Sequence, residues 1–372
     1  MKKIADVLHM KYMTSAAIAL ALLCGSVPAF AYNNTQPPPA PAAAVETLKL
    51  DDAVAAAIAA SGSLKNYEDN IPIAEKNISD LYDALMETTT NADYVKIRSQ
   101  VMQAESKRDI DALNAQTTRQ QLTVSVWQAF ESVVSARNAL ALYDQSLGLQ
   151  KRQLDISKVR LRLGLMSQLD FNTADSGYKK AVSDRVAKAS AVDTAYMNLN
   201  KLLGRGLSRR YDLIFSADYE PMAPASLGQD VQAAIDANTT VMSLQNNIKI
   251  TQYQIRYYDD SVPQAQTLAQ LNASVSGDTR SLADAKTAIE QKLTAQNAKI
   301  LQQEASFDSQ KAALDAQLAQ LNAKKTQLRL GMTTQIDADT AAQSVASQEE
   351  SLRALTVDHA IAVMQYQWPN TL

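Results

Sequence analysis

Apolar residues recur at every seventh position in two separate stretches of the chain. The first series is Val126, Val133, Leu140, Leu147, Leu154 and Leu161. The second series is Leu293, Ile300, Phe307, Leu314, Leu321 and Leu328. A strict period of seven is typical of helices that wind around each other as a left-handed coiled coil. The pattern therefore predicts two long helices, each with one continuous apolar seam.

Each series runs into a segment that occurs twice, as residues 160–174 and again as residues 327–341. Both copies hold an arginine, a glycine, a hydroxyl residue and an aspartate at the same spacing. Cations suit a helix C-terminus, glycine suits the left-handed residue that follows it, and a hydroxyl three positions before an acid is typical of a helix N-cap. The residues are Arg162, Gly164, Ser167 and Asp170, and then Arg329, Gly331, Thr334 and Asp337. Each copy is therefore predicted to form the tight tip of a helical hairpin.

The chain beyond residue 45 is predicted to be a tandem duplication. Leu50, Val54, Ala56, Ala57, Ile58 and Ala60 recur 177 positions later as Leu227, Val231, Ala233, Ala234, Ile235 and Ala237. At the tips the offset is only 167, so we expect ten additional residues in the first repeat, between Leu85 and Lys96. Proline is absent from 73–220 and 264–368, as very long helices require. The predicted fold class is all-α, with two tandem repeats of long antiparallel helical hairpins.

These patterns predict five parts in the order of the chain. They are a signal peptide over 1–31, a proline-rich leader over 32–45, repeat 1 over 46–204, an irregular connector over 205–226 and repeat 2 over 227–369. The signal is indicated by a basic start, a short apolar run and the small-x-small sequence Ala29-Phe30-Ala31. Within the repeats, helices are expected over 91–163, 168–203, 227–259, 263–330 and 335–368, and as a shorter pair joined at 61–63.

Charge and composition argue against several classes of function. The chain has 36 basic and 39 acidic residues, so no positive excess indicates a nucleic-acid partner. The single cysteine, Cys24, falls in the expected signal, and His359 is the only histidine beyond it. His359 lies in a series of seventh positions with Val345, Leu352 and Tyr366, which predicts a hydrogen-bonded seam residue. We therefore expect no metal site, no cofactor and no enzymatic activity.

The duplicated plan resembles the outer-membrane efflux proteins, the TolC-like family of channel-tunnels. The resemblance rests on Leu50-Asp51-Asp52-Ala53-Val54, on both tip sequences and on Leu202-Leu203-Gly204 at the end of the first hairpin. It implies a homotrimer in the cell envelope, exported to the periplasm and outer membrane. The hairpins of such a trimer form an α-helical barrel whose tips meet a periplasmic adaptor of an inner-membrane transporter. The implied function is a passive conduit in a tripartite efflux or type I export system.

The chain departs from this family where membrane strands are expected. A membrane strand needs about 9–11 residues of alternating polarity, and residues 83–93 offer none. Residues 269–276 alternate and are one weak candidate. The fold prediction is therefore a TolC-like α-barrel protomer whose β-barrel strands are reduced or absent.

The resemblance also assigns roles to the tips, each with an alternative. The docking residues for the adaptor would be Gly164, Leu165, Met166, Ser167, Gly331, Met332, Thr333 and Thr334. Asp170 and Asp337 would form acidic rings at the tunnel mouth, or would only cap helices. Arg162 and Arg329 would pair with the tip acids across hairpins, or would be solvated helix-end charges. We expect Leu165, Met166, Met332 and Thr333 to face outward. The alternatives for the whole protein are a coiled-coil scaffold of the envelope without a conduit, and a periplasmic adaptor, which would carry other domains around one hairpin.

Overall fold

A computed structural model describes residues 46–215, 217–223, 226–261 and 265–372. The expected signal peptide and leader, residues 1–45, lie outside the described residues. The described chain consists almost wholly of α-helices, which confirms the all-α prediction.

Repeat 1 contains two shorter helices, one very long helix and a returning helix. They are α1 (Leu50–Ala60), α2 (Gly62–Met86), α3 (Asn91–Arg162) and α4 (Gln168–Leu202). Ser61 separates the first two, and its side chain accepts a hydrogen bond from the backbone N–H of Leu64, which confirms the expected joint. At 1.5 Å per residue, the 72-residue α3 is about 110 Å long.

Repeat 2 follows the same order. Its elements are α5 (Leu227–Asp236), α6 (Thr239–Arg256), α7 (Leu268–Arg329) and α8 (Gln335–Gln367), followed by the 3-10 helix η2 (Pro369–Thr371). The single helix expected over 227–259 is wrong, because Ala237 and Asn238 interrupt it. The Asn238 side chain accepts hydrogen bonds from the backbone N–H groups of Thr240 and Val241, as a strong N-cap does. Asn238 is thus the counterpart in repeat 2 of Ser61 in repeat 1, and both residues cap the helix that follows them.

The length difference between the repeats lies inside the long helices. Helix α3 has 72 residues and α7 has 62, while their first residues, Asn91 and Leu268, keep the offset of 177. The prediction that placed the additional residues between Leu85 and Lys96 is therefore wrong. Low-complexity polar sequence at 87–91 suggested an insertion there, but that turn is the shorter of the two.

The segment with alternating polarity at 269–276 is not a strand. It forms the first turns of α7, which begins later than the expected 263. Thr267 caps this helix, since its hydroxyl accepts the backbone N–H of Gln270 while the Gln270 side chain accepts that of Thr267. This capping box satisfies the free amides at the helix start, and it decides between helix and strand for the residues that follow.

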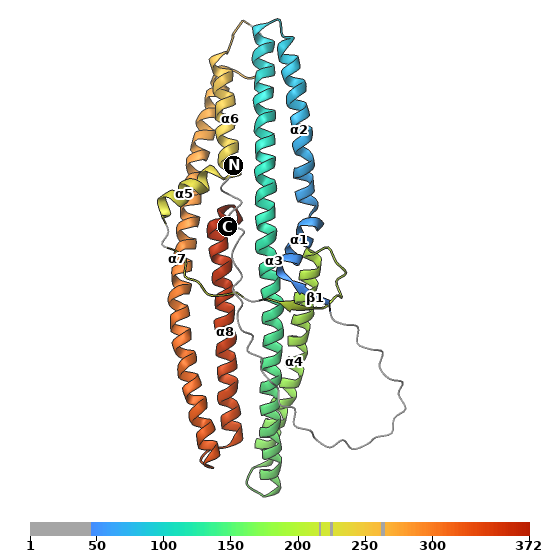
Figure 1. Cartoon of the computed structure of the whole chain (residues 1–372), viewed down its shortest axis with the longest axis vertical. Coiled ribbons are helices and arrows are strands. Elements are labelled where there is room, and N and C mark those ends of the chain that lie inside the picture. Colours follow the sequence, from blue (N-terminus) through green and yellow to red (C-terminus); the bar gives the residue numbers. More distant parts are fainter. Residues whose placement is uncertain (1–45, 216, 224–225, 262–264) are drawn as a thin grey trace, which may run out of the picture. The chain divides into compact units, whose positions relative to one another are not determined.

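The helices form a layer in which each long helix is flanked by two shorter ones placed end to end. Helix α3 packs on α2 and α4 within its own repeat, and on α6 and α8 of the other repeat (Figure 1). Helix α7 packs on α6 and α8. Val126, Val133, Leu154, Leu293, Ile300 and Leu321 are buried, and the other members of both predicted series are half-buried. The predicted apolar seams are therefore confirmed.

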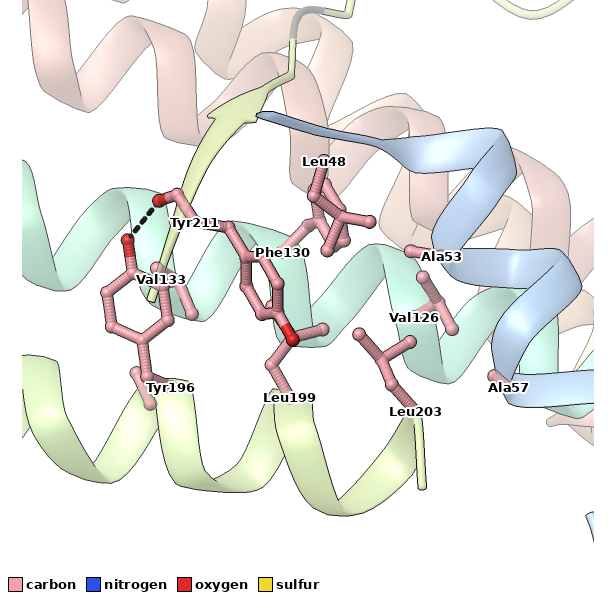
Figure 2. Close-up of a cluster of buried hydrophobic side chains, with 11 residues drawn as sticks. Leu48, Ala53, Ala57, Val126, Phe130, Val133, Tyr196, Leu199, Leu203 and Tyr211 are labelled. Atoms are coloured by element: carbon pink, nitrogen blue, oxygen red, sulfur yellow. Dashed lines mark hydrogen bonds between the residues drawn. The ribbon is translucent and has the colours of Figure 1, made fainter. Parts of the chain in front are cut away.

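The connector is partly ordered by a strand that the sequence did not predict. Strand β1 (Glu46–Lys49) pairs in parallel with β2 (Tyr211–Ile214), so that Glu46 lies opposite Tyr211. Side chains from both strands join α1, α3 and α4 in a buried cluster that includes Leu48, Phe130, Leu199 and Tyr211 (Figure 2). The Tyr196 hydroxyl donates a 2.8 Å hydrogen bond to the Tyr211 carbonyl oxygen within this cluster. The connector is thus fixed to the first hairpin near its end.

A second part of the connector is fixed to the other hairpin. The Met222 backbone N–H donates to the Glu304 carboxylate at 2.7 Å, and the Tyr219 ring stacks on Phe307. His359 is buried, and its Nε2 lies 3.2 Å from the same Glu304 oxygen. The prediction that His359 is a hydrogen-bonded residue of the helical seam is therefore confirmed.

Charged side chains join the two repeats where α3 meets α8. Arg353 contacts Glu131 at 2.7 Å and Glu350 at 2.7 Å, and the Asn138 amide donates to Glu350 at 2.6 Å. The hydrogen bonds to Glu350 and then to Glu131 raise the pKa of Arg353 above its ordinary value, despite partial burial. Nearer the tips, Arg152 of α3 pairs with Asp339 of α8. The junction inside the chain therefore combines these charged contacts with an apolar cluster in which Val124 of α3 packs on Val357 and Ile361 of α8.

Candidate functional site

The two hairpin tips are the parts of the chain that the sequence singled out as functional. The first joins α3 to α4 over residues 163–167, and the second joins α7 to α8 over residues 330–334. Both lie at the same end of the helical layer (Figure 1), as the pairing of Arg152 with Asp339 close to the tips requires. One chain therefore presents two similar turns side by side.

The turns have the backbone geometry that the sequence predicts. Gly164 has a φ of 74° and Gly331 a φ of 70°, both in the left-handed region that favours glycine. The backbone N–H of Leu165 donates to the Arg160 carbonyl, and that of Met332 donates to the Gln327 carbonyl, each at 2.8 Å. These bonds satisfy the last carbonyls of α3 and α7, so the chain reverses direction within a few residues.

Hydroxyl residues begin the returning helices. Ser167 accepts the backbone N–H of Asp170, and Thr334 accepts that of Asp337. The second tip is the more completely bonded, because the Asp337 carboxylate also accepts the backbone N–H of Thr334 and the hydroxyls of Thr334 and Thr333. The bonds from Thr334, and then the bond from Thr333, lower the pKa of Asp337 below its ordinary value.

The tip acids thus act as capping groups within the chain. Both side chains are exposed, so capping leaves part of each carboxylate open to solvent. Acidic rings at a tunnel mouth would need several copies of the chain and stay a prediction.

Large apolar side chains are exposed at both tips. Leu165 is 73% exposed and Met332 is 72% exposed, as expected. The expectation that Met166 and Thr333 also face outward is wrong, since both are half-buried on their own hairpins. Sequence reasoning missed Leu163 and Leu330, the residues just before the glycines, which are also largely exposed. The spacing could have indicated their exposure, because each lies two positions beyond the last residue of its apolar seam and so does not continue that seam.

The tip arginines do not pair with the tip acids inside the part of the chain that is described. Arg329 donates to the Thr326 hydroxyl at 3.2 Å, and neither Arg162 nor Arg329 forms an ion pair among the described residues. Pairing across hairpins of different copies stays a prediction. The contact that does join the hairpins near the tips, between Arg152 and Asp339, was not predicted.

Among the described residues, no group of three or more His, Cys, Asp or Glu side chains has a geometry that would hold a metal ion. No helix in the described ranges combines the length and apolar character needed to cross a membrane.

The fold is that of the helical outer-membrane channel proteins. A Pseudomonas aeruginosa membrane protein matches with a TM-score of 0.64 and 13% identity, over 88% of this chain and 91% of that chain. The Campylobacter jejuni CmeC outer membrane channel matches with a TM-score of 0.62 and 8% identity, over 87% and 86%. The Neisseria gonorrhoeae MtrE outer membrane channel, in its open state, matches with a TM-score of 0.61 and 14% identity, over 87% and 88%.

A family model adds sequence evidence to this likeness in fold. Residues 92–205, which cover α3 and α4 with the first tip, match the model described as "Outer membrane efflux protein". This match and the likeness in fold confirm the resemblance to the outer membrane efflux proteins that the sequence indicated. A search of curated proteins finds no match.

Proposed function

We propose that this protein is the passive conduit of a tripartite efflux or export system in the cell envelope. The observation that carries the proposal is the pair of matched tips, which expose Leu165 and Met332 to solvent on well-capped turns. Apolar side chains in such positions are seldom left uncovered, and a partner protein would cover them. The family match supports a conduit rather than an enzyme.

The partner in this proposal is a periplasmic adaptor that connects the tips to an inner-membrane transporter. The docking residues are Leu165 and Met332, with Leu163 and Leu330 beside them. Gly164, Gly331, Ser167 and Thr334 shape the turns that present them, while Met166 and Thr333 pack against the hairpins. Asp170 and Asp337 are proposed to face the mouth of the conduit while they cap their helices.

The proposed assembly is a homotrimer associated with the outer membrane. The helical layer of one chain has two uncovered sides, one along α7 and the other along α2 and α4, where Val186 is 64% exposed and Leu301 of α7 is 55% exposed. Two repeats per chain and three chains would give six hairpins around a closed tunnel. The closure of a ring removes both uncovered sides at once.

The test replaces both tip residues in the same protein, as Leu165→Asp with Met332→Asp. Both side chains are exposed and outside the seams, so helix content and melting should stay unchanged. Cells that depend on this protein should become sensitive to exported compounds. Leu207→Asp is the matched control, because Leu207 is also an exposed leucine, 53% accessible, but lies in the connector.

Three outcomes would be informative. Loss of export with the tip variant and normal export with Leu207→Asp supports docking through the tips. Normal export with both variants would show that the tips are only turns. If no export phenotype follows even deletion of the protein, the scaffold interpretation, in which the hairpins only support the envelope, replaces the conduit.

A further inference from the structure

The duplication allows the junction inside one chain to be compared with a junction between chains. Inside the chain, α3 of repeat 1 lies against α6 and α8 of repeat 2. The helices that correspond to these three are α7, α2 and α4. If two copies of the chain packed in the same way as the two repeats do, α7 of one copy would lie against α2 and α4 of the other copy.

Three polar positions on α3 supply the charged part of the internal junction, beside the apolar cluster of Val124, Val357 and Ile361, and the counterparts of these three on α7 are alanines. Glu131, Asn138 and Arg152 contact α8 through ion pairs and hydrogen bonds. With the offset of 167 that aligns the seams and the tips, their counterparts are Ala298, Ala305 and Ala319. All three alanines are exposed and face no other helix of the described chain closely enough to be buried.

The opposing face shows the same replacement. On α8 the internal junction uses Arg353, Glu350 and Asp339. Their counterparts on α4 are Val186, Ser183 and Asn172, all exposed. Every charged residue of the three internal contacts is thus replaced by an uncharged one, and all six counterparts are small or medium-sized residues in exposed positions.

We propose that a second copy of this chain binds with α4 against α7 through an uncharged, close-packed junction. The inference rests on the proposed function, because a conduit needs several copies. In this junction Val186 lies opposite Ala298, Ser183 opposite Ala305 and Asn172 opposite Ala319 of the neighbouring copy. Small side chains allow two helices to approach more closely than arginine and glutamate do.

The difference between the two junctions also selects the correct partner. If α8 of another copy left its own α3 and approached α7, Arg353 would keep Glu350 but would meet Ala298 in place of Glu131. Unpaired buried charges cost several kcal/mol in general, so this wrong pairing is disfavoured. The junction with charged contacts joins the two repeats of one chain, and the junction without them joins neighbouring copies.

Disulfide trapping tests the register of the proposed junction. Full-length protein with Cys24→Ser, Val186→Cys and Ala298→Cys should form covalent dimers and trimers on oxidation, because facing helix positions meet the geometry of a disulfide. The matched control carries Thr326→Cys in place of Ala298→Cys. Thr326 is exposed and lies on the same side of α7, about 42 Å further along the helix, so it should not cross-link to Val186→Cys.

A charge exchange tests the chemistry. Val186→Arg alone should weaken assembly at least about tenfold, because it places an unpaired cation in the junction. Adding Ala298→Glu reproduces the internal pair of Arg353 with Glu131 and should restore assembly. Circular dichroism of each variant checks that the helices remain.

The outcomes separate this inference from the proposed function. Trimers by light scattering without cross-linking of Val186→Cys to Ala298→Cys would overturn the junction and leave the conduit intact. Failure of Ala298→Glu to rescue Val186→Arg would also overturn it. A concentration-independent monomer of the unaltered protein would defeat the trimeric conduit itself.

Discussion

Arg353 of α8 donates two hydrogen bonds to the carboxylate of Glu131 on α3. Its Nη1 lies 2.7 Å from one carboxylate oxygen, and its Nη2 lies 2.8 Å from the other. The two residues belong to different repeats, and Glu350 and Asn138 complete a network around them. This paired arrangement fixes the angle and register at which the second hairpin lies on the first.

Removal of the Arg353 side chain should destabilise the protein strongly. Arg353→Ala leaves Glu131 and Glu350 close together, with their side chains only 12% and 18% exposed and no cation between them. We expect a loss of about 2–3 kcal/mol in the free energy of unfolding. Urea denaturation at one fixed protein concentration measures it.

Arg185→Ala is the matched control for this change. Arg185 of α4 also makes two hydrogen bonds to a carboxylate, that of Asp144, but both side chains are well exposed. Exposed pairs contribute little, so the control should unfold nearly as the unaltered protein does. Equal losses for both variants would contradict a special role for the junction between repeats.

Gly204→Ala should destabilise the protein more than Gly164→Ala. Both glycines have positive φ, which costs an alanine about 1 kcal/mol in each case. At Gly204 an added Cβ would also lie 2.8 Å from the Ala60 Cβ, whereas nothing lies within 4 Å at Gly164. The clash should add a further ~1–3 kcal/mol, measured as the difference between the two variants in urea. Similar losses would show that α1 can move away from the end of α4.

The start of α8 should depend on pH through Asp337. Its folded pKa lies below its ordinary value because Thr334 and Thr333 donate hydrogen bonds to the carboxylate. The ionised form therefore stabilises the native turn at neutral pH, and this contribution is lost as the pH falls through the folded pKa. Asp337→Asn should speed hydrogen exchange of residues 335–338 at neutral pH, and the difference from the unaltered protein should vanish in strong acid.

Asp170→Asn provides the comparison at the other tip. The Asp170 carboxylate accepts a hydrogen bond from the Ser167 hydroxyl alone, whereas the Asp337 carboxylate accepts three, one of them from the backbone N–H of Thr334. Hydrogen exchange at the start of α4 should therefore change less than at the start of α8. A larger change at the first tip would show that the capping bonds do not control the order of the turns.

Tyr196→Phe should loosen the connector without disturbing the hairpins. The change removes the buried hydrogen bond to the Tyr211 carbonyl and should cost about 1 kcal/mol. Hydrogen exchange over 211–215 should rise, while exchange at the tips stays constant. Tyr94→Phe is the control, since the Tyr94 hydroxyl is at an exposed residue with no hydrogen bond among the described residues. Unchanged exchange over 211–215 would mean that strand pairing alone holds the connector.

The sequence by itself determined the helices, their seams and their turns. The apolar seam from Val126 to Leu161 and the turns at the tip glycines depend on residues that lie within a few helical turns of each other. The spacing of these residues in the sequence therefore predicts both features. Duplication made these signals firmer, because Gly331 and Thr334 repeat the spacing of Gly164 and Ser167. The capping at both tips follows from the same local bonds.

Only the tertiary structure decided which distant segments meet. Strand β2 is four residues long and gains its hydrogen bonds from β1, more than 160 positions earlier, so no local pattern in 205–226 predicts it. The pairing of Glu131 with Arg353 likewise cannot be predicted from the sequence, because each residue is one of many charged residues on a long helix. Which charges are buried depends on which helices are neighbours, and that is set by the packing of the whole layer.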